Sequence, residues 1–269
     1  MTDPRAAGIQ VADDRLPALA ESVRTIAEDA GRIIMDIYRR GFDVTEKADA
    51  TPVTDADHAA EAAILPRLQA LTPDVPVISE EAAAAGALPD CDGLTFWAVD
   101  PLDGTREFIA RSGEFSVNIG LIRAGVPVLG VVHGPALDVS FFNSGPGRAM
   151  RAETGGPGIP IATRTLPDDG LTVIGSRSHG SSRKVNAFLA DKTVAGHRVM
   201  GSALKFGFLA DGSADVYARF GPTSEWDTAA GHAVLRAAGG DVLSEDGATL
   251  RYGKARYLNG GFIAWGRVP

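Results

Sequence analysis

Two aspartates that stand three positions apart are the first candidates for chemistry in this sequence. Asp100 and Asp103 follow the apolar run at 96–99, which we expect to form a buried strand, and Gly104 and Thr105 come directly after them. Glycine lets the backbone approach another group closely, and free amides at the start of a helical segment attract anions. The loop therefore offers acids for a cation beside amides for an anion, although an ordinary Asp-Gly turn would have the same residues.

Three further acidic motifs have an ordinary structural explanation when each is taken alone. Glu80, in the run Ser-Glu-Glu at 79–81, is typical of an exposed surface. Asp227 is typical of a helix N-terminus, and Asp57 of a capping box with Thr54. Together with the aspartate pair, these carboxylates indicate a hard oxygen site, suited to Mg²⁺ or Mn²⁺ rather than to zinc. Such a cluster needs bound cations to offset its repulsion, and these ions bind a phosphate and activate water.

The elements that must position these residues follow from hydrophobic periodicity. Apolar residues at steps of three and four from Leu16 predict an amphipathic helix that ends at Gly41. A second helix is expected to begin after Thr54, and Pro66 to kink or interrupt it. Short β-rich runs with Gly and Pro between them predict a largely antiparallel sheet, with strands at 77–78, 96–99, 116–122, 128–132 and 139–142.

The remainder of the chain mixes helices and strands without strict alternation. The segment 143–160 is rich in Gly and Pro and is the expected boundary between an N-terminal α+β half, 1–145, and a C-terminal α/β half, 146–269. We expect strands at 171–175, 214–218 and 262–265, and helices at 181–189, 202–210 and 228–238. This pattern predicts a layered α+β architecture.

The overall composition excludes several classes of protein. The 26 Lys and Arg residues against 34 Asp and Glu give a net charge of −8, which argues against a nucleic-acid or anionic-membrane surface. Cys91 is the single cysteine, so no internal disulfide can form, and no Cys/His spacing resembles a zinc site. No apolar run is long enough to span a bilayer, and the N-terminus has no signal-peptide pattern. We expect a cytoplasmic protein, with peripheral attachment to the inner membrane face as the alternative.

The motifs DPLDGT at 100–105 and WDTAAG at 226–231 resemble the two signatures of the inositol monophosphatase superfamily, and Ser-Glu-Glu at 79–81 stands at the spacing that the family shares. The resemblance covers nearly the whole chain from residue 16 onward. It implies the layered α-β-α-β-α sandwich of the inositol monophosphatase and fructose-1,6-bisphosphatase type. It also implies a lithium-sensitive phosphatase that uses two or three Mg²⁺ ions, with Mn²⁺ as a substitute.

The same resemblance implies a role for each matched residue. It makes metal ligands of the carboxylates of Glu80, Asp100, Asp103 and Asp227 and of the backbone carbonyl of Leu102. Asp57 and Thr105 would orient or deprotonate the attacking water, and the amides of Gly104 and Thr105 would hold the phosphate.

The segments around this site resemble the CysQ-type bacterial 3'(2'),5'-bisphosphate nucleotidases within the superfamily. Inositol monophosphatases generally have an acid near the position of Arg219 and a neutral residue at that of Lys205, whereas both are cations here. A guanidinium and an ammonium suit a second phosphate better than the hydroxyls of an uncharged polyol. The resemblance also implies that Ser176, His179 and Gly201 lie at the substrate.

Two positions depart from the nucleotidase pattern. Ala203 stands where the family usually has Ser, and Ala218 where it usually has Pro. Both lie beside the segments expected to contact the substrate, so these departures bear on the leaving group and not on the metal chemistry.

The expected reaction is therefore hydrolysis of the 3'-phosphate of adenosine 3',5'-bisphosphate (PAP) to give AMP, with phosphoadenosine phosphosulfate (PAPS) as a parallel substrate, in sulfur metabolism. The alternative is a phosphatase of the same fold that acts on inositol 1-phosphate or fructose 1,6-bisphosphate. A more distant alternative is a non-catalytic regulator that binds metal and phosphate, which would be expected to lack a ligand. We expect a monomer or a homodimer.

Overall fold

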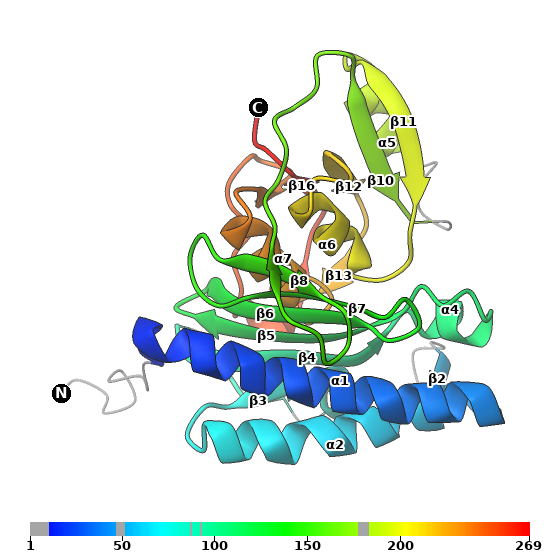
Figure 1. The fold of residues 1–269 in the computed structure, drawn as a ribbon, viewed down its shortest axis with the longest axis vertical. Helices are drawn as coiled ribbons and strands as arrows, with labels where there is room; N and C mark the ends of the chain where they lie inside the picture. The colour runs from blue at the N-terminus through cyan, green and yellow to red at the C-terminus, as the bar shows by residue number, and fades with distance from the viewer. Residues whose placement is uncertain (1–10, 47–51, 87, 92, 177–182) are drawn as a thin grey trace.

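The computed structural model describes residues 11–46, 52–86, 88–91, 93–176 and 183–269, and these form alternating layers of helix and sheet (Figure 1). Helices α1 (Leu16–Arg40) and α2 (Asp55–Leu71) lie together under a seven-stranded sheet. Helices α6 (Leu204–Ala210) and α7 (Ala229–Ala237) separate it from a five-stranded sheet, and α5 (Arg183–Leu189) lies beyond β10 and β11. The α-β-α-β-α sandwich implied by the resemblance is thus confirmed.

The seven-stranded sheet has the strand order β3-β4-β5-β6-β7-β8-β9. Its strands are Val77–Ser79, Thr95–Asp103, Ser116–Arg123, Val126–Gly134, Val139–Asn143, Ala149–Ala152 and Ile159–Pro160. Only β3 and β4 pair in parallel, so the prediction of a largely antiparallel sheet is confirmed. Strands β8 and β9 fall within the Gly- and Pro-rich segment and extend this sheet, while the division into two halves stays a prediction.

The five-stranded sheet has the order β11-β10-β12-β16-β14. Its members, in chain order, are β10 (Leu171–Gly175), β11 (Val194–Val199), β12 (Val216–Arg219), β14 (Asp241–Ser244) and β16 (Phe262–Trp265). The smaller elements are β1 (Val44–Glu46), β2 (Pro52–Thr54), α3 (Glu80–Ala84), α4 (Thr105–Ile109), β13 (Thr223–Ser224), β15 (Leu258–Asn259) and the 3₁₀ helices Asp13–Arg15 and Ala255–Tyr257. Among the described residues, no helix is both long enough and apolar enough to cross a membrane.

Strand β4 is buried on both faces, which explains the apolar run at 96–99. Trp97 and Val99 belong to the core beneath the sheet, with α1 and α2, whereas Phe96 and Ala98 belong to the core above it, with α6 and α7. This alternation follows from the two-residue period of a strand. The strand is therefore anchored on both sides where it delivers the aspartate pair.

The predicted interruption of the second helix at Pro66 is wrong, because α2 is continuous from Asp55 to Leu71. Pro66 is exposed, whereas Ile64 and Leu68 are buried on the side that packs against α1. The ring lies on the solvent face, where water can satisfy a carbonyl that loses its helical donor. The buried face of the helix therefore holds it together across the proline.

Candidate active site

A β-bulge at the end of β4 sets the positions of the aspartate pair. Asp100 lies opposite Asn118 and Asp103 opposite Ser116, so three residue steps on β4 match two on β5. A bulge bends its strand and changes the direction of the side chains near it. Asp100 is buried, its Oδ1 accepts a hydrogen bond from Leu102 N at 3.0 Å, and Asp103 lines a pocket.

Asp103 is held by two donors on one oxygen. Its Oδ2 accepts hydrogen bonds from Asn118 Nδ2 at 3.1 Å and from the amide of Ala203 at 2.5 Å. Ser116 Oγ donates to Asn118 Oδ1 at 2.9 Å and so orients the amide of that residue. The other oxygen, Oδ1, accepts no hydrogen bond from a described residue, and this leaves it for a ligand.

Glu80 is brought to the same edge by the parallel pairing of β3 with β4. Ser79 pairs with Val99, and because parallel strands run in one direction, the residues after each strand emerge side by side. Glu80 is the first residue of α3, whose amide at Ala82 donates to Ser79 Oγ at 3.3 Å. Its charge is one of the causes that raise the pKa of Asp100, as expected of neighbouring carboxylates.

Asp57 and Thr105 form a hydrogen-bonded pair. The predicted capping box is present, since Asp57 Oδ2 accepts from Thr54 N at 2.7 Å and from Thr54 Oγ1 at 2.8 Å. The other oxygen of Asp57 faces Thr105, whose Oγ1 lies 3.2 Å away and also lies 3.3 Å from the carbonyl oxygen of Leu102. The cap of α2 therefore fixes a carboxylate against the hydroxyl that the resemblance assigns to the attacking water.

Asp227 arrives from the other side of the sheet, directly before the segment that starts α7. Its Oδ2 accepts a hydrogen bond from Ser224 N at 3.0 Å. Small residues let α7 lie almost against the sheet: a methyl group built on Gly130 of β6 would stand 2.1 Å from the carbonyl oxygen of Ala230. The small side chains of the Ala-Ala-Gly run at 229–231 permit this close packing, which brings Asp227 to the bulge of β4.

The carboxylates repel one another strongly. Burial and the charges of Glu80, Asp103, Asp227 and Asp57 raise the pKa of Asp100 well above its usual range. Burial raises the pKa of Asp227 to about 8 and that of Asp57 to about 6, with neighbouring acids contributing to both. Burial also raises the pKa of Asp103, against the opposing charge of Lys205. Each of these groups would hold its charge more readily beside a cation.

The donor chemistry of the site fits a hard divalent cation, because all the candidate ligands are oxygens. Among the described residues, no group of three or more His, Cys, Asp or Glu side chains is arranged to hold a metal ion as it stands. The carboxylates are therefore gathered by the fold and would have to turn toward an ion to enclose it.

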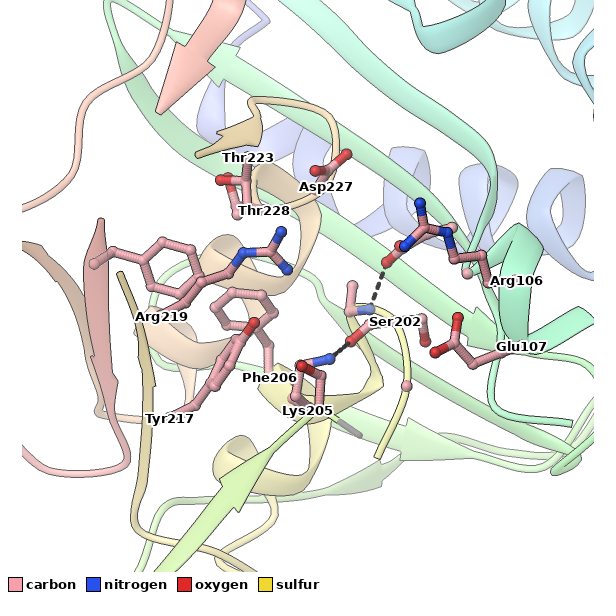
Figure 2. Close-up of a pocket in the computed structure, with 16 residues that line it drawn as sticks. Arg106, Glu107, Ser202, Lys205, Phe206, Tyr217, Arg219, Thr223, Asp227 and Thr228 are labelled. Carbon is pink, nitrogen blue, oxygen red and sulfur yellow. Dashed lines mark hydrogen bonds between the residues drawn. The ribbon is translucent and has the colours of Figure 1, made fainter. Parts of the chain in front are cut away.

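The pocket beside these acids is lined by cations and aromatic rings from the C-terminal part of the chain (Figure 2). Arg219 of β12 extends its guanidinium toward Thr228 and Asp227, and its charge lowers the pKa of Asp227. Arg219 Nη2 donates to Pro222 O at 3.2 Å, while its buried Nε has no partner among the described residues. Arg106 of α4, which is exposed, lies on the opposite side.

The other residues that the resemblance implied at the substrate are placed as follows. Ser176, Gly201 and Lys205 line the pocket, and Gly104 lies in it with a left-handed φ of 93°. Lys205 is only 4 % exposed and points into the wall rather than into the pocket. His179 lies outside the described residues.

Sequence reasoning missed Asn118, Glu114 and Arg106. Asn118 holds Asp103, and Glu114 Oε2 accepts a hydrogen bond from Gly201 N at 2.9 Å. All three stand in segments around the site, whose resemblance to the nucleotidases gave no role to any one of these side chains.

The model of the inositol monophosphatase family matches residues 16–265. The chain belongs to the inositol monophosphatase family. Membership implies dependence on a divalent metal ion, in agreement with the all-oxygen donor set.

Relatives within the inositol monophosphatase family include the 3'(2'),5'-bisphosphate nucleotidase CysQ of Salmonella typhimurium, which is 44% identical over 91% of this chain and 98% of its own length. The crystal structure of CysQ from Bacteroides thetaiotaomicron is 36% identical, with a TM-score of 0.77 over 94% of this chain and 98% of that one. An inositol monophosphatase from Anabaena is 27% identical, with a TM-score of 0.70 over 94% of this chain and 92% of that one.

Proposed function

We propose that this chain is a Mg²⁺-dependent phosphomonoesterase that hydrolyses the 3'-phosphate of PAP to give AMP and phosphate. PAPS, with the same 3'-phosphate, is its second substrate. The proposal agrees with the names of the nucleotidases to which the chain is similar over nearly its full length. The observation that carries it is the guanidinium of Arg219 in the same pocket as Asp103 and Asp227.

The charge pattern of the pocket favours a substrate with two anionic groups. A phosphate bound over Asp103 and Asp227 would lie beside Arg219, which lines the same pocket. The buried Nε of Arg219 has no hydrogen-bond partner among the described residues. A guanidinium pairs well with phosphate oxygens, whereas the hydroxyls of a polyol would leave its charge unpaired. Arg219 stands where inositol monophosphatases generally have an acid that accepts hydrogen bonds from hydroxyls. Its cation would therefore pair poorly with inositol hydroxyls and disfavour inositol phosphates.

The carboxylates of Glu80, Asp100, Asp103 and Asp227 and the carbonyl of Leu102 would hold two or three Mg²⁺ ions. Bound Mg²⁺ would neutralise charge on the phosphate and lower the pKa of the attacking water. Mn²⁺ would substitute for Mg²⁺ and Li⁺ would inhibit. A cytoplasmic location and a monomeric or homodimeric state stay predictions.

Asp57 and Thr105 would orient the water and accept its proton. The carboxylate of Asp57 cannot rotate freely, because Thr54 occupies its Oδ2 through two hydrogen bonds. Its Oδ1 therefore stays beside Thr105 Oγ1, and this hydroxyl can accept from water while it donates to Asp57. The amides of Gly104 and Thr105, at the start of α4, would hold the phosphate while Ser176 and Gly201 line the pocket around the nucleotide.

A substrate panel tests this proposal. Phosphate release with Mg²⁺ is measured for PAP, inositol 1-phosphate and fructose 1,6-bisphosphate, each with and without lithium. We expect kcat/KM to be highest for PAP and to fall when lithium is added. A preference for inositol 1-phosphate or fructose 1,6-bisphosphate would contradict it, and the absence of turnover with all three would favour the non-catalytic alternative.

A further inference from the structure

Lys205 is buried in the pocket wall with its ammonium group engaged. Its Nζ donates to the carbonyl oxygens of Ser202 at 2.5 Å and Met200 at 3.3 Å, and lies 5.1 Å from the centre of the Tyr217 ring (Figure 2). To reach a substrate, the ammonium would have to leave both carbonyls and the ring. A buried acceptor that loses its donor is costly, so this position of Lys205 is favoured.

The two carbonyls belong to a tightly constrained loop, residues 200–203. Ser202 has a left-handed φ of 50°, which is unfavourable for a residue other than glycine. A methyl group on Gly201 would stand 2.3 Å from the carbonyl oxygen of Glu114, so the loop has no room to shift toward the segment between α4 and β5. Lys205 thus holds the loop from one side and Glu114 from the other, through its bond to Gly201 N.

The last residue of the loop, Ala203, is hydrogen-bonded to Asp103. The amide of Ala203, directly after the left-handed Ser202, donates to Asp103 Oδ2 at 2.5 Å. The direction of that amide depends on the peptide plane whose carbonyl belongs to Ser202, and this carbonyl is the one that Lys205 binds at 2.5 Å. Lys205 and Asp103 are therefore linked through a single peptide unit.

We infer that Lys205 is a positioning residue, which fixes the peptide between Ser202 and Ala203 and through it the carboxylate of Asp103, and that it does not bind the second phosphate. Recognition of that phosphate then falls to Arg219, whose guanidinium points into the pocket. The inference rests on the proposed function only in treating Asp103 as a metal ligand. It reassigns Lys205 from the substrate role that the sequence suggested.

Matched methionine substitutions separate the two roles, because methionine keeps the length of the side chain and removes its charge. For Lys205→Met we expect kcat to fall about 10- to 100-fold with both PAP and 3'-AMP, as for residues that orient metal ligands. The ratio of the two KM values should stay unchanged. The Mg²⁺ concentration that gives half of the maximal thermal shift, measured without substrate, should rise by a similar factor. Arg219→Met should instead raise KM for PAP relative to 3'-AMP.

A selective rise in KM for PAP in Lys205→Met, with an unchanged Mg²⁺ midpoint, would overturn the inference. If that variant unfolds, Lys205→Gln keeps a donor for Ser202 and is measured in the same way. Ser202→Gly in the Lys205→Met background provides a rescue test, since glycine adopts the left-handed conformation without support. We expect it to restore part of the Mg²⁺ affinity, and no recovery would count against the loop mechanism. A wild-type preference for inositol 1-phosphate would contradict the proposed function alone, because the Mg²⁺ midpoint needs no substrate.

Discussion

At the scale of single residues, the site is a set of buried carboxylates whose charges are made unfavourable by burial and by one another. Asp103 is central to it, because it lines the pocket and is fixed by donors from two separate segments, Asn118 and the amide of Ala203. Burial raises its pKa, so its charge is unfavourable in the folded protein without a cation. The charge of Asp103 thus lowers the stability of the metal-free protein and would favour metal binding.

Asp103→Asn should abolish turnover and leave the fold intact. The amide oxygen of the variant can accept the same two hydrogen bonds. The substitution removes the negative charge that would bind the metal, so we expect kcat/KM to fall about 100-fold or more. In EDTA the Tm should equal or exceed that of the wild type, because an unfavourable charge is gone. The thermal shift produced by Mg²⁺ should shrink. Near-normal phosphate release by this variant would show that the metal assignment is wrong.

The buried side chain of His133 should make the unfolding free energy of the protein depend on pH. The His133 side chain is 1 % exposed and lies against Gly31 of α1, its Nδ1 is 2.9 Å from Ser140 Oγ, and burial lowers its pKa from 6.5 to about 4. The His133 imidazole binds a proton less readily in the folded chain than in the unfolded chain. Its contribution to the unfolding free energy is therefore fully present above pH 6.5 and is lost as the pH falls toward 4. The loss amounts to about 3 kcal/mol of unfolding free energy. Urea unfolding between these limits should show a weaker pH dependence in His133→Gln, and identical profiles would contradict this account.

At the scale of elements, the site exists because α7 and the sheet approach more closely than a normal side chain allows. Gly120 and Gly130 on neighbouring strands face the backbone of Ala229 and Ala230. This contact brings Asp227, which precedes α7, to the end of β4. The glycines of the sheet are therefore part of the architecture of the site.

Gly130→Ala should destabilise the protein and reduce turnover together. Its methyl group would stand 2.1 Å from the carbonyl oxygen of Ala230, which forces α7 outward at a cost of about 1–3 kcal/mol. Gly196→Ala is the matched control, because that strand glycine has nothing within 4 Å of the added methyl group. Chemical unfolding should show a loss for the first and little change for the second. Equal stabilities for the two variants would contradict the proposed packing.

Much of the fold, and the gathering of the acids at one site, could be predicted from the sequence, because both depend on local patterns. The period-two burial of β4 and the capping box of Asp57 are short-range features, and the acidic motifs matched family signatures. The error at Pro66 arose because one-dimensional reasoning could not place the ring on the solvent face. The orientation of Lys205 depends on the left-handed backbone conformation of Ser202, which a serine in the sequence does not predict.

At the scale of the whole molecule, the charge of −8 argues against an extended polyanion partner but not against a small anionic substrate. A group of the acids is gathered at the junction of two layers, where cations would reverse the local sign. Arg219 and Arg106 face the same pocket from β12 and α4, elements that belong to different parts of the chain. The sandwich thus places an acidic edge of one sheet beside a cationic pocket wall.

The identity of the product tests the central claim most directly. PAP is incubated with the enzyme and Mg²⁺, and the nucleotide product is identified by chromatography against 5'-AMP and 3'-AMP standards. The account predicts 5'-AMP and one equivalent of phosphate, since the 3'-phosphate would lie over the acids and Arg219 would hold the 5'-phosphate. Formation of 3'-AMP, or no turnover of PAP while inositol 1-phosphate is hydrolysed, would contradict it.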